Sequence, residues 1–189
     1  MNALNICVTD LATLSPIKLE MYRGDSFQVV IDKPEDALTA AIALRAKLKS
    51  TTPDESDMMW DARLSVGIGE ISFESDSILT SDGEAFRLSG RSFDNLGKKK
   101  LHISTPWKDL DNNIELVTRF ADDIISSWTA KQARVVYHSI LFPKRQKDLA
   151  EELGMTRQNF NYHWNSSKVP LILDYIEYYK SLIAKHNQQ

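Results

Sequence analysis

The stretch QKDLAEELGMTRQNFNYHWNS, residues 146–166, predicts two short helices joined by a tight turn. Small and apolar residues give the first helix one buried face: Leu149, Ala150 and Leu153. Gly154 follows that helix, where the turn between two crossing helices commonly requires a positive φ that glycine adopts without strain. Thr156 can cap the second helix by accepting a backbone hydrogen bond. Two aromatic residues at i, i+4 spacing then return to the core: Phe160 and Trp164. This pattern predicts a helix-turn-helix over Gln146–Asn165.

Polar side chains are expected to face outward from this segment. One of them, Lys147, is in the first helix. The others belong to the second helix: Thr156 at its start, and Arg157, Gln158, Asn161, Tyr162 and Asn165 along it. Arginine pairs with guanine edges and Asn or Gln with adenine, while lysine and hydroxyl groups hold phosphates. Residues 144–168 include five basic and three acidic side chains, a local net charge of +2 that permits phosphate contacts. We therefore expect this face to bind double-stranded DNA.

The segment resembles the helix-turn-helix of phage repressors and of many bacterial regulators, with the spacing of Gln146, Ala150 and Gly154 intact. The resemblance implies sequence-specific DNA binding. His163 departs from that pattern, because an aliphatic residue is usual there; either Trp164 packs in its place or the helix is slightly rotated. The alternative interpretation is a helical hairpin that only packs, since motifs of this length also arise by chance.

Further helices are predicted on both sides of the motif, over Asp109–Ser127, Thr129–Leu141 and Pro170–Lys185. The last of them has more apolar and aromatic residues than one narrow face needs: Leu171, Ile172, Leu173, Tyr175, Ile176, Tyr179, Leu182 and Ile183. Core packing and a dimer seam both account for this excess. Because regulators with such motifs usually bind paired half-sites, we expect a homodimer.

The first part of the chain mixes predicted helices and strands, whereas only helices follow it. The expected elements are a helix over 2–13, a β-hairpin of Ile17–Tyr22 and Phe27–Ile31 around the turn 23–26, a helix from Pro34, a strand over Asp61–Phe73, a helix over Gly83–Leu96 and a strand over Leu101–Ser104. Gly67 and Gly69 indicate close packing or a bulge in the long strand. The sequence thus predicts an α+β domain over 1–106 and an all-helical domain over 107–189.

Composition and charge restrict the class of protein. The chain has 189 residues, 42% hydrophobic and 26% charged, which is typical of a globular protein. Its net charge of −3 argues against nucleic acid covering its whole length. We expect a cytoplasmic protein, because no apolar run approaches the roughly 18 residues of a membrane span and the N-terminus lacks the pattern of a secretion signal. The single Cys7 is expected to be buried.

Three segments, YRGDSFQVVI, RLSVGIGEI and SDGEAFRLSGRSFDNL, resemble the palm domain of class III nucleotidyl cyclases and GGDEF-type diguanylate cyclases. Over most of its length the chain is similar to SatD-family proteins of bacteria, some relatives of which carry a C-terminal helix-turn-helix. The matching positions are Arg23–Gln28, Ser65–Glu70 and Asp82–Arg91. The resemblance implies a ferredoxin-like, cyclase-like fold, a metal-binding carboxylate in the hairpin turn and a helix beside a nucleotide.

Asp25 is the residue that could supply this carboxylate to Mg²⁺ or a nucleotide. Two-metal phosphoryl transfer needs a second carboxylate, which normally comes from an earlier strand. Only 24 residues precede Asp25, too few for a strand, a helix and a return, and Asp10 is expected within the N-terminal helix. Either the palm is truncated here, without its first strand, or the start of the chain has been placed late. The other interpretation of Asp25 is a turn residue that hydrogen-bonds its own backbone.

These observations favour a DNA-binding transcription regulator whose degenerate cyclase-like domain senses a ligand or mediates assembly. No catalytic residue and no metal site other than Asp25 is expected, since the four histidines show no metal-ligand spacing. Two alternatives remain open. One is a nucleotide-binding or nucleotidyl cyclase-type enzyme, and the other is a protein-interaction module whose helical tail only packs.

Overall fold

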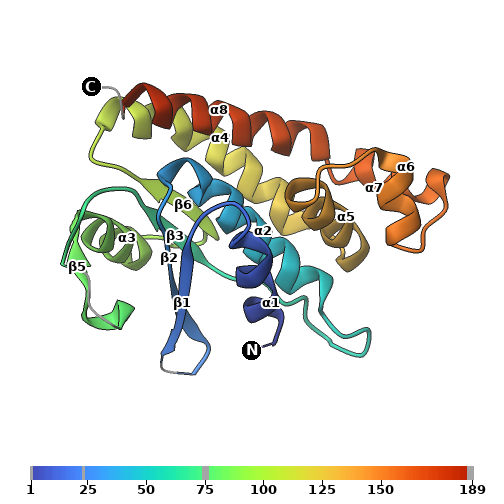
Figure 1. Ribbon diagram of the computed structural model, residues 1–189, viewed down its shortest axis with the longest axis horizontal. Coiled ribbons are helices and arrows are strands. Elements are labelled where there is room, and N and C mark those ends of the chain that lie inside the picture. Colours follow the sequence, from blue (N-terminus) through green and yellow to red (C-terminus); the bar gives the residue numbers. More distant parts are fainter. Residues whose placement is uncertain (1, 23, 74–76, 187–189) are drawn as a thin grey trace.

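The computed structural model describes residues 2–22, 24–73 and 77–186. Strands and helices are mixed up to residue 104 and only helices follow, so the fold is α+β (Figure 1). The elements are α1 (Asn2–Leu11), β1 (Ile17–Tyr22), β2 (Ser26–Ile31), η1 (Pro34–Asp36), α2 (Ala37–Ser50), β3 (Leu64–Gly67), β4 (Ile71–Phe73), η2 (Ile78–Thr80), β5 (Asp82–Gly83), α3 (Glu84–Asp94), β6 (Leu101–Ser104), α4 (Lys108–Ser127), α5 (Ala130–Leu141), α6 (Gln146–Glu152), α7 (Arg157–Ser166) and α8 (Val169–His186). Within these ranges no helix is long and apolar enough to cross a membrane.

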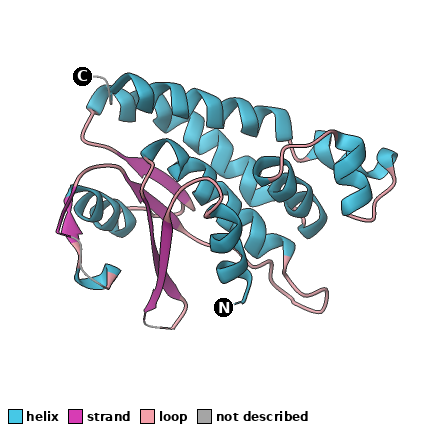
Figure 2. Ribbon diagram, viewed as in Figure 1, coloured by secondary structure: helices cyan, strands magenta, loops and turns pink. Residues whose placement is uncertain are grey.

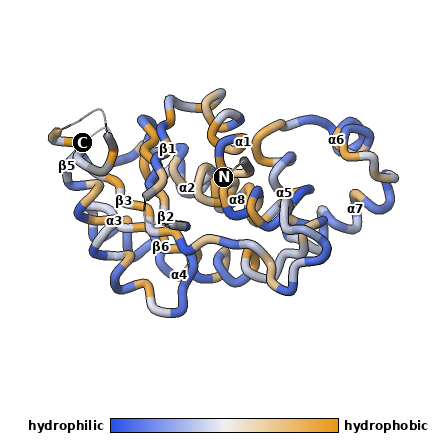
Figure 3. Tube along the Cα trace, turned by 90° about the horizontal axis from the view of Figure 1, so that it is seen from below, coloured by the Kyte–Doolittle hydropathy of each residue, from blue (hydrophilic) through white to orange (hydrophobic). Residues whose placement is uncertain are grey.

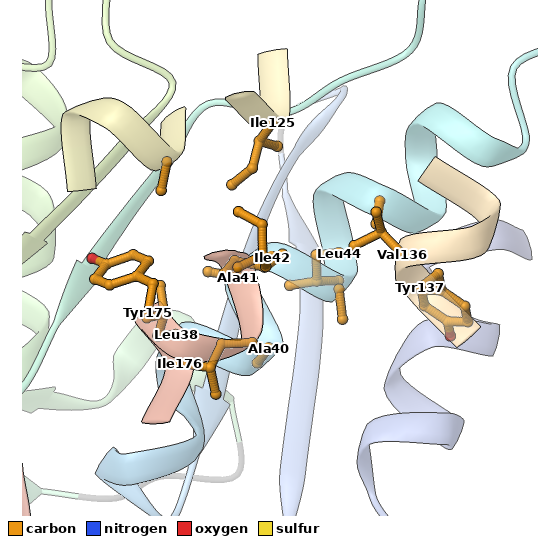
Figure 4. Close-up of a cluster of buried hydrophobic side chains, with 14 of the residues drawn as sticks. Leu38, Ala40, Ala41, Ile42, Leu44, Ile125, Val136, Tyr137, Tyr175 and Ile176 are labelled. Carbon is orange, nitrogen blue, oxygen red and sulfur yellow. The ribbon is translucent and has the colours of Figure 1, made fainter. Parts of the chain in front are cut away.

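Helix α2 lies at the centre of the hydrophobic core. The sequence predicted one apolar stripe on this helix, but every residue from Ala37 to Ala46 is buried. The alanines of this segment allow the close approach of other helices, and a helix that is apolar all round is stable only when it is covered on all sides. Figure 4 shows side chains of α2, among them Leu38, Ile42 and Leu44, together with Ile125 of α4, Val136 and Tyr137 of α5, and Tyr175 and Ile176 of α8.

The sequence predicted a single strand over Asp61–Phe73, and this prediction is wrong. The structure has two separate strands in this segment, β3 and β4. The two glycines explain the division. A Cβ at Gly67 would collide with the carbonyl oxygen of Ala85, and one at Gly69 would lie 2.9 Å from Glu84 Cγ. Because glycine has no Cβ, α3 can pack directly on the backbone at these two positions. Strand β3 then pairs with β6 in parallel, with α3 in the connection between them, whereas β4 pairs with β5 antiparallel.

The predicted β-hairpin is confirmed. Strands β1 and β2 pair antiparallel from Ile17–Ile31 to Tyr22–Ser26. Gly24 has a φ of 79°, which suits the tight turn; Arg23 lies outside the described residues. Figure 2 shows the hairpin extending away from the helices. In the described part of the chain no ladder of hydrogen bonds joins it to β3 and β6.

The first and last helices of the helical half, α4 and α8, are long and antiparallel. The start of α4 meets the end of α8, where His186 Nε2 lies 3.1 Å from Asp109 Oδ2. At the opposite end, Trp128 Nε1 donates to the Ser167 carbonyl oxygen over 2.9 Å. One hydrophobic core contains residues from both halves of the chain, from Leu4 to Ile183. The division into domains at 106 and 107 stays a prediction, and the packing of α2 against α4, α5 and α8 crosses that boundary.

A buried ionic network joins the two halves beside this core. Arg45 of α2 is fully buried and donates two hydrogen bonds of 2.9 Å to Asp61 and one of 2.6 Å to Asp122 of α4. Lys100 Nζ also lies 3.1 Å from Asp61. Burial by itself would raise the pKa of Asp61, but the hydrogen bonds and charge of Arg45, followed by those of Lys100 and Lys49, outweigh it and lower that pKa.

Candidate nucleic-acid interface

Helices α6 and α7 form the predicted pair, joined by residues 153–156. Gly154 has a φ of 65°, as the sequence predicted for this turn, and Met155 N donates to the Ala150 carbonyl oxygen over 2.9 Å. Thr156 is the N-cap of α7, and its hydroxyl accepts from Asn159 N over 3.2 Å. The turn therefore fixes the direction in which α7 leaves α6.

One face of this pair is held in the core. Leu149, Ala150, Leu153 and Phe160 are buried, and α7 packs against α5 as well as α6. Trp164 is half-buried against the core, and its ring centroid lies 5.8 Å from that of Phe160. Because the buried side of α7 is fixed in this way, its opposite side is directed to solvent.

All seven residues predicted to contact DNA are exposed. They are Lys147 on α6, Thr156 at the cap, and Arg157, Gln158, Asn161, Tyr162 and Asn165 along α7. Tyr162 is 66% exposed, which is high for an aromatic side chain. Helices α6 and α7 lie at one end of the molecule (Figure 1), and Figure 3 shows this end as mostly hydrophilic.

Hydrogen bonds between amide side chains link the exposed faces of α6 and α7. Asn165 Nδ2 donates to Asn161 Oδ1 over 2.9 Å, and Asn161 Nδ2 donates to Gln146 Oε1 over 3.5 Å. Sequence reasoning noted Gln146 for its spacing and did not assign it to the binding face. Its position at the start of the first helix, beside polar residues of the second, was the signal that could have assigned it to this face. These hydrogen bonds orient the Asn161 side chain, which is exposed to solvent.

The charges of this surface are partly compensated within the motif. Arg145 donates to Asp148 over 2.8 Å, and this hydrogen bond lowers the pKa of Asp148. Lys144 pairs in the same way with Glu152. Lys147, Arg157 and Lys168, all exposed, make no ion pair with any residue that the structure describes. These three cations carry the positive charge that is available to phosphates.

His163, the departure from the expected pattern, fills a half-buried position on α7. Burial lowers its pKa and the charge of Lys131 lowers it further, so the ring is neutral at pH 7. Its Nδ1 atom is buried and has no hydrogen-bond partner within the described ranges. His163 is thus half-buried on α7, while the polar residues around it remain exposed.

Asp25 is exposed in the turn between β1 and β2. Among the described residues there is no group of three or more His, Cys, Asp or Glu side chains placed to hold a metal ion. Asp10, which sequence reasoning placed in the N-terminal helix, lies in α1 and accepts a 2.6 Å hydrogen bond from the Tyr137 hydroxyl. Asp10 is therefore held against α5 by this hydrogen bond.

The polar surface of α6 and α7 is consequently the best-defined candidate site of the described chain. Comparisons of the chain with protein-family models, with curated proteins and with solved structures found no match.

Proposed function

We propose that the protein is a transcription regulator that binds double-stranded DNA through α6 and α7. The observation that carries this proposal is the two-sided character of α7. Phe160 is fully buried on one side, while Arg157, Gln158 and Asn161 are exposed on the other. A helix held in this way by a preceding helix and a tight turn has the geometry that places side chains against base edges in a major groove.

Arg157 and Gln158 lie in the first turn of α7, the part of a recognition helix that contacts bases. Arg157 is suited to guanine and Gln158 to adenine, whereas Lys147 and Lys168 are suited to phosphates. With two cations assigned to phosphates, the logarithm of the binding constant should fall with the logarithm of salt concentration with a slope of roughly −2 per chain.

The test uses the full-length protein and a library of double-stranded fragments, from which bound sequences are selected and their affinities measured. Arg157→Ala and Gln158→Ala should each weaken binding to the selected sequence by about 1–3 kcal/mol and relax its preference at one base pair. Lys147→Ala should weaken binding to all sequences and reduce the salt slope by about 1.

Arg91→Ala is the matched control, because Arg91 is an exposed arginine on α3, at the other end of the molecule (Figure 1). It removes the same charge and should leave the preference unchanged. Equal binding of the selected sequence by wild type and Arg157→Ala would exclude α7 as the recognition helix. No sequence preference in the wild type would favour a hairpin that only packs.

We also propose that the residues before α4 form a degenerate, truncated cyclase-like palm, related to SatD-family proteins, with a sensory or assembly role. The order of hairpin, helix, strand, helix and strand supports this proposal, as does the close packing of α3 on Gly67. Calorimetric titration with Mg²⁺ and with nucleoside triphosphates tests it. Binding that is lost in Asp25→Ala would identify a ligand site at the hairpin and make the enzymatic alternative worth assaying.

A further inference from the structure

We infer that the exposed surface shared by α4 and α8 is a two-fold interface with a second copy of this chain. The inference deepens the proposed function and rests on it. One recognition helix with few free cations gives limited specificity for a DNA sequence, and binding of two half-sites by two copies increases that specificity. The sequence suggested that the apolar stripe of α8 could be a dimer seam. That stripe is instead mostly core, since Ile172, Tyr175, Ile176 and Tyr179 are all buried.

Four large apolar side chains of the two helices remain on the surface. Leu116 and Phe120 of α4 are 55% and 63% exposed, and Leu171 and Tyr178 of α8 are 57% and 40% exposed. Together they expose roughly 400 Å² of side-chain surface, because a large apolar or aromatic side chain has about 150–250 Å² to bury. Exposed apolar surface of this size on a monomer is often functional. We call these four residues the α4–α8 patch.

The positions of the four residues are symmetric along the helices. The Thr118 and Tyr175 hydroxyls lie 2.5 Å apart and mark one level on the antiparallel pair. Leu116 and Phe120 lie two residues before and after that level on α4, while Leu171 and Tyr178 lie four before and three after it on α8. Since both helices rise 1.5 Å per residue, Phe120 lies at the Leu171 end of the patch and Leu116 at the Tyr178 end.

A two-fold axis at this level, in the plane of the patch and perpendicular to the helices, therefore makes the patch complementary to itself. It brings Leu116 of one copy opposite Phe120 of the other, and Leu171 opposite Tyr178. Such an isologous contact is the commonest way in which identical chains pair. A stable interface buries about 800 Å² per partner, of which the patch would contribute about half.

The charges next to the patch also permit self-association. Arg119, Asp123 and Asp174 are exposed, and none of them forms an ion pair within the described ranges. Both signs are therefore present on each copy, so the charge around the patch does not by itself oppose self-association. Helix α7 leads directly into α8, so the two recognition helices would lie toward the two ends of the dimer (Figure 1).

Sedimentation velocity of the full chain without DNA, at about 1–100 µM, tests the inference. We expect a species with twice the mass of the 21.5-kDa chain. Phe120→Glu and Leu171→Glu should each raise the dissociation constant of the dimer by about 30- to 1000-fold, as for the loss of an interface hot spot. Phe73→Glu is the matched control, because Phe73 is 59% exposed on β4, outside the patch, and should leave the dimer intact.

Circular dichroism must show that all the variants are folded, and having two independent variants keeps the test decisive if one of them is not. A wild type that is monomeric at every concentration overturns the inference, as does a dimer that both patch variants leave unchanged. A monomer that still binds a selected DNA sequence would overturn the dimer and leave the proposed function standing. A dimer that depends on the patch, in a protein without preference for any DNA sequence, would support the interface and overturn the proposed function.

Discussion

Arg45 shows how one residue can connect distant parts of the chain. It lies on the buried helix α2, and its guanidinium group forms ion pairs with Asp61, before β3, and with Asp122, within α4. Asp122 also accepts a hydrogen bond from Lys100 N over 2.8 Å, at the start of β6. Removal of one member of a buried pair leaves the other charge uncompensated, which costs more than the pair contributes.

We predict that Asp122→Ala lowers the free energy of unfolding by about 3 kcal/mol, because it strips Arg45 of one partner and leaves Lys100 N without its acceptor. Urea denaturation followed by circular dichroism measures the change. Asp57→Ala is the control: Asp57 is exposed, makes no ion pair with a described residue, and its loss should change stability by less than about 0.5 kcal/mol. Equal stability of Asp122→Ala and wild type would contradict the role given to the network.

At the scale of elements, glycine conformation decides how helices follow one another. Gly154 has a positive φ of 65° between α6 and α7, with open space around the position of a Cβ. Gly90 also has open space around it but lies inside helix α3, without a positive φ. The same substitution should therefore have opposite effects at the two positions.

We predict that Gly154→Ala destabilises the protein by about 1–2 kcal/mol, the cost of a left-handed conformation for a residue with a Cβ. Gly90→Ala should stabilise it by about 0.5–1 kcal/mol, because alanine loses less conformational entropy in a helix. Thermal unfolding of both variants provides the comparison. If Gly154→Ala proved neutral, the turn would not need its left-handed residue, and the direction of α7 would be set by packing alone.

At the scale of the whole molecule, both halves of the chain are built around α2. This helix contacts α1 and β3 in the first half, and α4, α5 and α8 in the second. Helices α5 to α8, which position the candidate interface, thus share their core with the α+β half. A ligand or mutation that shifts α2 would act on both halves through that contact.

We predict that residues 107–189 do not fold cooperatively without the first half, because α4, α5 and α8 would expose the surface that α2 covers. The full chain should unfold in one transition, with coincident midpoints by far-UV circular dichroism and by intrinsic tryptophan fluorescence, to which the buried Trp128 contributes. A cooperative melting transition in the isolated 107–189 fragment would instead support two independent domains, as the sequence predicted.

The sequence by itself determined the elements whose signals are local. The α6–α7 pair followed from Gly154, Thr156 and the apolar periodicity, and the hairpin from its turn; the hydroxyl cap and the left-handed glycine lie where the sequence predicted them. The exposed face of α7 was predictable for the same reason, because the placement of Phe160 on one side of a helix determines what lies on the other.

Only the tertiary structure decided which side chains meet across the chain. The break between β3 and β4 depends on the approach of α3 to Gly67, and the burial of Arg45 depends on acidic residues from two other segments. The position of Arg45 among apolar residues of α2 was a signal of its burial but not of its partners. The apolar residues of α8 divide between core and surface according to where α2 and α4 lie. Such contacts join residues that are distant in sequence, so they are fixed by packing of the whole core rather than by any local pattern.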